Sequence, residues 1–193
     1  MKYFQVWPDM NVIGRWILGD VRHLNNWDLI KPPNWLMEPG HFQLDVTQQG
    51  HEMDYSFAGY ACVTVVSDAF RTALAGLPEV DEPYRSVVME SVSINGQEVG
   101  GSYFLLIVET RLDCIDELRS DFTRFEIEDA VRPDLAGEYS AFTKLVIDAD
   151  RVAGHHIFRL EGFAGALVVS EEVKSRLDAA GVVGIEYDLV SGN

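Results

Sequence analysis

Residues 168–189 constrain the fold more than any other stretch, because they carry in succession the patterns of a strand, a capped helix and a second strand. The β-branched run ends at Ser170, whose hydroxyl can cap a helix, and two glutamates follow in the first turn, where carboxylates suit the helix dipole. Val173 and Leu177 fall on one apolar face, and Gly181 marks the end of the helix. Alternating residues at the end of the stretch predict the second strand.

The same arrangement occurs earlier in the chain, at a constant offset of 103 residues from 65 to 168. A β-branched run ends at Ser67, and Phe70 and Leu74 occupy the positions of the later apolar face. The match is short, so it is compatible both with two related units and with chance. It leaves open whether the 193 residues form a single domain or two lobes, residues 1–110 and residues 111–193.

Other segments carry strand patterns, with few further helices. Asn95-Gly96 is a strong hairpin signal between the expected strands 86–94 and 102–109. Further strands are expected at residues 42–46, 61–67, 142–147 and 156–160. The sequence therefore predicts an α+β fold of mostly antiparallel sheets with two short Ser-capped helices.

The formal net charge of −16 bounds the function more than any motif does. Such a field repels nucleic acid and anionic membranes and favours basic partners. No apolar run approaches the roughly 20 residues of a membrane-spanning helix, and the first residues lack a signal-peptide pattern, which favours the cytoplasm. Cys62 and Cys114 are accordingly expected to be reduced and buried.

The sequence carries no recognisable catalytic or metal-binding motif, so we expect no cofactor. His155 and His156 would point to opposite faces of a strand, which disfavours a shared metal site. Asp113, Asp116 and Glu117 are close enough to hold a divalent cation or form an acid–base pair, which leaves a carboxylate- or metal-dependent enzyme as an alternative. A small-ligand module is the other alternative, since all four tryptophans lie in the first 60 residues: Trp7, Trp16, Trp27 and Trp35.

Residues 111–138 are the most charged part of the chain, with nine acidic and four basic side chains. Interleaved apolar residues, Leu118 and Ile127 among them, indicate a folded segment rather than a disordered tail. The segment is therefore expected to present one acidic face.

Several short motifs resemble a family of bacterial immunity proteins encoded beside polymorphic toxins. They are Tyr3-Phe4, Cys114-Ile115-Asp116 with Ser120, Phe158-Arg159-Leu160, Val168-Val169-Ser170 with Lys174 and Leu177, Gly181, and Gly184-Ile185-Glu186-Tyr187. The resemblance runs over almost the whole chain. It implies a cytoplasmic protein that binds and neutralises a cognate secreted toxin, with no catalytic residues of its own.

An immunity protein with this charge would suit a basic toxin, whose active-site cleft an acidic surface can block. The expected toxin-binding residues are Asp113, Asp116, Glu117, Asp121, Glu126, Glu128 and Asp129. For Asp116 a structural role is the alternative, either capping a helix or accepting a hydrogen bond from Ser120 or Arg159. The sequence does not determine the oligomeric state.

Overall fold

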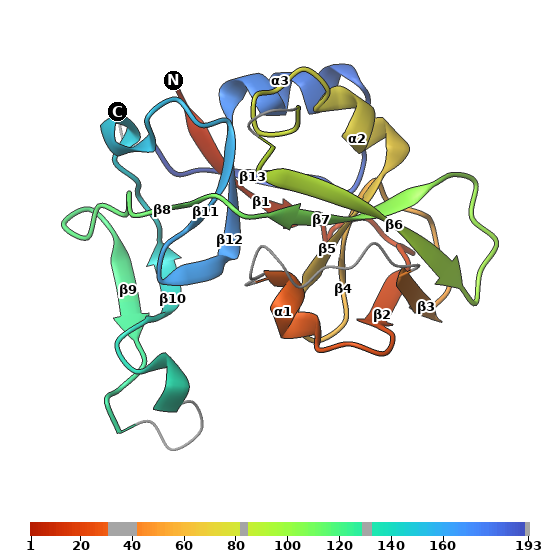
Figure 1. Ribbon diagram of the computed structural model, residues 1–193, viewed down its shortest axis with the longest axis horizontal. Coiled ribbons are helices and arrows are strands. Elements are labelled where there is room, and N and C mark those ends of the chain that lie inside the picture. The colour runs from red at the N-terminus through yellow and green to blue at the C-terminus, as the bar shows by residue number, and fades with distance from the viewer. Residues whose placement is uncertain (31–41, 82–84, 129–132, 192–193) are drawn as a thin grey trace.

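The computed structural model describes residues 1–30, 42–81, 85–128 and 133–191. Most of its regular structure is strand, arranged as a closed barrel, a five-stranded sheet and a separate two-stranded hairpin. Figure 1 shows the barrel and the five-stranded sheet side by side, with the hairpin projecting from the body of the molecule.

Six strands close the barrel in the order β2-β3-β6-β7-β5-β4. Their bounds are β2 Ile17–Val21, β3 Phe42–Gln48, β4 Tyr55–Ala58, β5 Val63–Ser67, β6 Val87–Asn95 and β7 Tyr103–Val108. The predicted hairpin is confirmed, since Val87 pairs with Val108 and Gly96 takes a positive φ of 89° in the connection. The short helix α1 (Asn26–Ile30) contributes Leu29 and Ile30 to the barrel core.

The five-stranded sheet combines the two ends of the chain in the order β13-β1-β12-β11-β8. Its strands are β13 Ile185–Leu189, β1 Tyr3–Pro8, β12 Phe163–Ser170, β11 Ile157–Leu160 and β8 Arg111–Leu112. The two-stranded hairpin is made by β9 (Asp121–Arg124) and β10 (Tyr139–Lys144), and two 3-10 helices, η1 (Pro133–Leu135) and η2 (Ala149–Val152), complete the described elements.

Both predicted Ser-capped helices are present. Ser67 caps α2 (Asp68–Ala73) by accepting from Phe70 N, and Ser170 caps α3 (Glu171–Ala179) by accepting from Val173 N, each at 3.3 Å. Gly181 ends the second helix as expected: at its positive φ of 70° it donates to the Asp178 carbonyl, and the next residue donates to that of Leu177. Both bonds satisfy carbonyls that a helix end would otherwise leave unpaired.

The two strand–helix units pack into one interior, although their strands lie in two different sheets. β7 lies between β5 and β6 just as β1 lies between β12 and β13. Corresponding positions pair alike, with Ser67 opposite Tyr103 and Ser170 opposite Tyr3. The helices α2 and α3 contact each other above the sheets (Figure 1). A single apolar cluster contains Val66, Phe70 and Leu74 together with Val169, Val173 and Leu177.

The α+β class is confirmed, but the expectation of mostly antiparallel sheets is met only in part. Both larger sheets are mixed, because β3 pairs parallel with β6, β4 with β2 and β11 with β8. Hairpin signals predict antiparallel neighbours only, whereas these parallel pairs join strands from distant parts of the chain. The division into lobes at residue 110 stays a prediction.

The two cysteines are both free thiols, but only one is buried. Cys114 is fully buried, as expected. Cys62 is exposed, because β5 begins one residue later and Cys62 lies in the preceding turn with a φ of 55°. The apolar run therefore starts as a turn rather than as a strand.

Candidate functional site

The acidic segment forms an arm that projects from the body of the molecule (Figure 1). We call the described residues 121–128 and 133–144 the arm; β9 and β10 form its antiparallel stem, and η1 lies in its distal part. The register of the stem shifts twice, between Tyr139 and Ala141 and between Phe142 and Lys144, and such irregularities bend a ribbon and increase its twist. Residues 121–128 of the acidic segment thus lie on a narrow projection, and the expectation of one acidic face stays a prediction.

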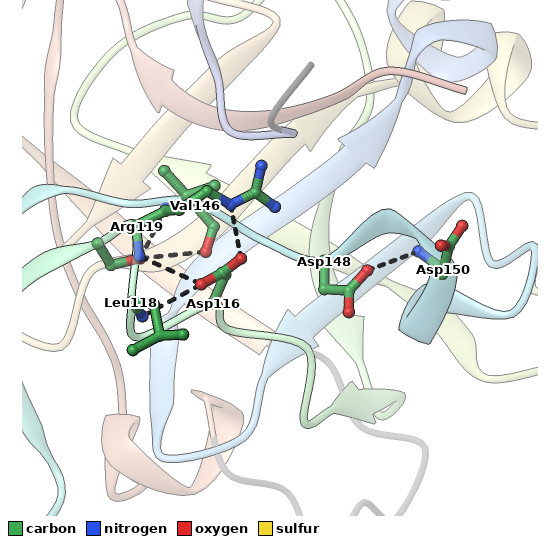
Figure 2. A network of polar contacts seen from close by, with 7 residues as sticks. Asp116, Leu118, Arg119, Val146, Asp148 and Asp150 are labelled. Carbon is green, nitrogen blue, oxygen red and sulfur yellow. Dashed lines mark hydrogen bonds and ion pairs between the residues drawn. The ribbon is translucent and has the colours of Figure 1, made fainter.

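Asp116 holds the turn that leads into the arm (Figure 2). Its carboxylate accepts from the backbone N–H groups of Leu118 and Arg119, both at 3.1 Å, and from Arg119 Nε at 2.6 Å. The Arg119 bond lowers the pKa of Asp116 more than any other interaction. The backbone of Asp116 also accepts from Ser120 N at 3.0 Å. Asp116 therefore acts as a structural residue, through Leu118 and Arg119 rather than through Arg159.

Ser120 fastens the root of the arm to the body. Its buried hydroxyl donates to the Val146 carbonyl at 3.1 Å and accepts from Val146 N at 2.9 Å. Asp116 N donates to the same carbonyl at 2.9 Å (Figure 2). The buried Cys114 extends this strand-like contact, because its carbonyl accepts from Asp148 N at 2.8 Å. These bonds join the chain just before the arm to the chain just after it, so both ends of the arm are anchored to the body.

Aromatic rings in edge-to-face and tilted contacts stiffen the stem of the arm and attach it to the sheet. Tyr139 contacts Phe122 and Phe142, with ring centroids 5.1 and 4.9 Å apart, and Phe142 contacts Phe163 of β12 at 4.9 Å. The Arg124 guanidinium lies over the Tyr139 ring, 4.0 Å from its centroid, in a cation–π contact that attracts the positive charge to the ring face. The arm thus has a small apolar spine of its own.

Glu117 is tied to this spine by two short contacts. Its Oε1 accepts from the Tyr139 hydroxyl and from Arg124 Nη2, both at 2.6 Å. The hydrogen bond from Tyr139, followed by the charge of Arg124, lowers the pKa of Glu117. Burial, reinforced by the same hydrogen bond, raises the pKa of Tyr139 to about 12. The carboxylate of Glu117 is therefore already engaged within the molecule.

The seven predicted binding residues separate into two groups. Asp113, Asp116 and Glu117 each pair with an arginine of the chain, Arg151, Arg119 and Arg124 respectively. Asp121, Glu126 and Glu128 are exposed, and their side chains make no ion pair or hydrogen bond with the described residues. Asp129 lies outside the described residues. The uncompensated charge is thus on the arm itself and not on the turn that precedes it.

Two apolar side chains in this region are almost fully exposed, which the sequence analysis did not foresee. Leu118 is 99% exposed and Ile127 is 86% exposed, so neither packs in the interior. A shallow hollow of about 350 Å³ opens on the stem, lined by Ser120, Asp121, Phe122, Thr123, Ala141 and Thr143. Exposed apolar residues beside unpaired charges are a composition typical of protein-binding surfaces.

Other acidic and histidine side chains have structural partners. Glu52 accepts from Tyr103 Oη at 2.8 Å and from Gly100 N at 3.0 Å, and Asp54 accepts from Val183 N at 2.8 Å. The two neighbouring histidines face different partners, because His156 Nδ1 lies 3.0 Å from Ser170 Oγ and His155 Nδ1 lies 3.8 Å from Glu79 Oε1. In the described ranges, no three His, Cys, Asp or Glu side chains are placed to hold a metal ion.

The tryptophans are dispersed over separate elements. Trp16 is buried in the barrel core and donates to Ser56 Oγ at 2.9 Å. Trp7 of β1 and Trp27 of α1 are 37% and 48% exposed, and Trp35 lies outside the described residues. No helix of the described chain is long and apolar enough to span a membrane.

Comparison with known proteins gives one match that covers most of the chain. The model of a family described as Immunity protein family (Imm11) matches residues 19–191. The matched residues include the barrel from β2 onward, the arm and all of the five-stranded sheet except β1. No curated protein matches the chain.

Proposed function

The chain belongs to the Imm11 immunity protein family, and we propose that it protects its own cell by binding a cognate toxin and blocking the active-site cleft of that toxin with the acidic arm. Family membership indicates an immunity protein that acts against a toxin. Such a role requires a stable one-to-one complex and no turnover. We place the protein in the cytoplasm, without a cofactor, and its partner among secreted toxins of the polymorphic type.

The projection of the arm is the observation that supports this mode of inhibition best. A narrow, stiffened hairpin that leaves the body of the molecule matches a concave partner, whereas a flat acidic face would not enter a cleft. Ser120 and the aromatic spine hold the arm in one orientation, so little conformational entropy is lost when it binds. Asp121, Glu126 and Glu128 then meet the basic residues of the toxin without first breaking an internal ion pair with a described residue.

Charge and exposed apolar surface have separate roles in this proposal. The net charge of −16 accelerates encounter with a basic toxin and disfavours acidic partners. Leu118 and Ile127 supply apolar contacts that become buried in the complex. A toxin that attacks nucleic acid or nucleotides carries the basic cleft that such a surface fits.

Co-expression with the toxin encoded beside this chain tests the role itself. Cells that make both proteins are expected to grow, and loss of growth in the presence of both would refute the immunity role. The same pair, purified, gives the association rate that the arm is proposed to control.

Reversal of the unpaired charges tests the arm. The triple variant Asp121→Lys, Glu126→Lys and Glu128→Lys is expected to associate with the toxin about tenfold or more slowly at low salt, with the difference shrinking as salt screens the field. A control with the same change of net charge reverses three exposed acids elsewhere: Asp81, Glu98 and Asp150. Equal association rates for the two triple variants would remove the arm from the interface.

A further inference from the structure

The five-stranded sheet has an open edge at β13. The strand order runs β13-β1-β12-β11-β8, and no strand of the described chain pairs with the outer side of β13. Its pairing with β1 continues without a register shift from Phe4 opposite Leu189 to Pro8 opposite Ile185. An edge of five regular residues, with no bulge and no proline in β13, retains the geometry that accepts another strand.

The register determines which backbone groups of β13 remain available. At one end of the pairing Asp9 N donates to the Gly184 carbonyl at 2.9 Å, and at the other end Val190 N donates to the Tyr3 carbonyl at 3.0 Å. In an antiparallel pair, residues that exchange hydrogen bonds alternate with residues that do not. Both end bonds join residues that continue this register, and alternating pairs inward from either end assigns the same residues of β13 to the hydrogen-bonded pairs with β1.

Three residues of β13 therefore direct their N–H and C=O groups away from β1. They are Ile185, Tyr187 and Leu189, whereas Glu186 and Asp188 direct theirs toward β1. The outward groups have no backbone partner among the described residues. The chain itself occupies the two ends of this row, because Asp54 N donates to the Val183 carbonyl at 3.1 Å and Ser191 bridges to Ile147. Between these ends the edge offers donors and acceptors in the spacing of a strand.

The exposed side chains of β13 determine which charge a strand that pairs with this edge can carry. Glu186 and Asp188 lie on the same face, both are exposed, and neither forms an ion pair with a described residue. If two copies paired antiparallel about Tyr187, Glu186 of each would lie opposite Asp188 of the other. Like charges directly opposite are destabilising, so the edge disfavours self-association and favours a strand that carries lysine or arginine.

Exposed apolar surface accompanies this edge. Leu189 is 52% exposed on β13, and Trp7, which lies opposite Glu186 on β1, is 37% exposed. An added strand would bury both in part. Backbone hydrogen bonds with flanking side-chain contacts are the usual components of strand addition.

We propose that the outer edge of β13 binds an extended basic segment of the toxin as an additional strand. This rests on the proposed function and gives the toxin a second contact, distinct from the arm. The arm provides charge at a projecting hairpin, whereas β13 provides a ladder of backbone bonds that fixes the register of the partner.

Amide hydrogen exchange measured by NMR on the full chain, free and bound to the toxin, tests the edge residue by residue. In the free protein the amides of Glu186 and Asp188 are expected to exchange slowly and those of Ile185, Tyr187 and Leu189 quickly. In the complex all five are expected to be protected. A complex in which the three outward amides still exchange quickly would overturn the inference and leave the proposed function intact.

Two variants test the same edge by affinity. Leu189→Pro removes one outward N–H without touching the bonds to β1, and is expected to weaken toxin binding about fivefold relative to the control Leu189→Ala, which keeps the N–H. Should the proline variant fail to fold, Glu186→Lys with Asp188→Lys replaces it, compared with reversal of the exposed acids Asp81 and Glu98. Equal affinities within either pair would exclude the edge from the interface.

The remaining outcomes are also decisive. A toxin that does not bind the full chain refutes the proposed function, and the docking edge with it. A free protein that runs as a dimer and already protects the outward amides shows that the edge pairs copies of this chain, which contradicts the like-charge argument.

Discussion

Replacement of Ser120 by alanine removes the two hydrogen bonds that attach the base of the arm to Val146, and the resulting loss of folding stability can be estimated from these contacts. The hydroxyl donates to the Val146 carbonyl and accepts from the Val146 N–H, in a site where Ser120 is only 8% exposed. The carbonyl retains a second donor, because Asp116 N also bonds to it at 2.9 Å. The N–H loses its acceptor, and a buried donor left without a partner costs about 1–3 kcal/mol.

We therefore expect Ser120→Ala to lower the free energy of unfolding by about 2 kcal/mol, a large fraction of the stability of an ordinary domain. For a chain of this size the midpoint of thermal unfolding should fall by about 4–8 °C. Urea unfolding followed by tryptophan fluorescence gives the free energy directly, because the buried Trp16 reports on the barrel core.

A matched control separates the loss of a buried bond from the loss of a hydroxyl. Ser140 lies on the arm and shares an exposed 2.8 Å bond with Thr123, so Ser140→Ala should change the free energy of unfolding by less than about 0.5 kcal/mol. The reasoning would be refuted by a Ser120→Ala protein as stable as the control whose Val146 amide exchanges no faster than in the unsubstituted protein. Faster exchange at Val146 with unchanged global stability would instead show that the arm detaches locally.

Three further predictions concern other contacts. Tyr139→Phe removes the hydrogen bond that is the largest cause of the lowered Glu117 pKa, so the pKa of Glu117 should rise in a carboxyl NMR titration. The stability contributed by this bond is present above the unfolded-state pKa of Glu117 and is lost as pH falls through the lowered folded-state pKa. The variant should therefore be less stable than the unsubstituted protein at neutral pH, but not in strong acid. Arg159→Met should change the free energy of unfolding by less than about 1 kcal/mol in urea, because burial lowers the pKa of this guanidinium to about 10 and it bonds the Ala164 carbonyl but no carboxylate among the described residues. Leu177→Ala should cost about 2–5 kcal/mol in the same assay, since the side chain is fully buried between the two strand–helix units, and a loss below about 1 kcal/mol would contradict the shared core.

Elements that depend on local sequence were predicted well. Ser67, Ser170 and Gly181 occupy their expected positions because a cap needs only the residues within one turn of it. The hairpin after Asn95-Gly96 has the same local origin. The parallel pairs that close the barrel have no such local origin, because β3 and β6 are separated by about fifty residues of chain. No periodicity within either strand encodes that choice of neighbour.

The candidate binding residues stay a prediction, made for a charged segment and not for single side chains. The composition of residues 111–138 did not indicate a projecting hairpin, and composition does not distinguish a carboxylate paired with an arginine three residues away from one that is free. Asp116 and Asp121 look alike in sequence, yet the first closes a turn and the second has no described partner. Composition does not place Leu118 either: it indicates a folded segment, but the turn held by Asp116 leaves this side chain 99% exposed.

The pairing of the acids distinguishes the turn before the arm, whose carboxylates hold the local structure, from the arm itself, whose carboxylates are available to a partner. Asp116 and Glu117 are linked to Arg119 and Arg124, so their substitution would act first on the folding of the arm and only through it on binding. Asp121, Glu126 and Glu128 can change without disturbing those bonds, so substitutions at these positions should cost little stability. Three of the residues that resemble the family, Cys114, Asp116 and Ser120, lie at the base of the arm, where they fix its orientation. It follows that specificity for a given toxin should be sought in the unpaired residues of the arm.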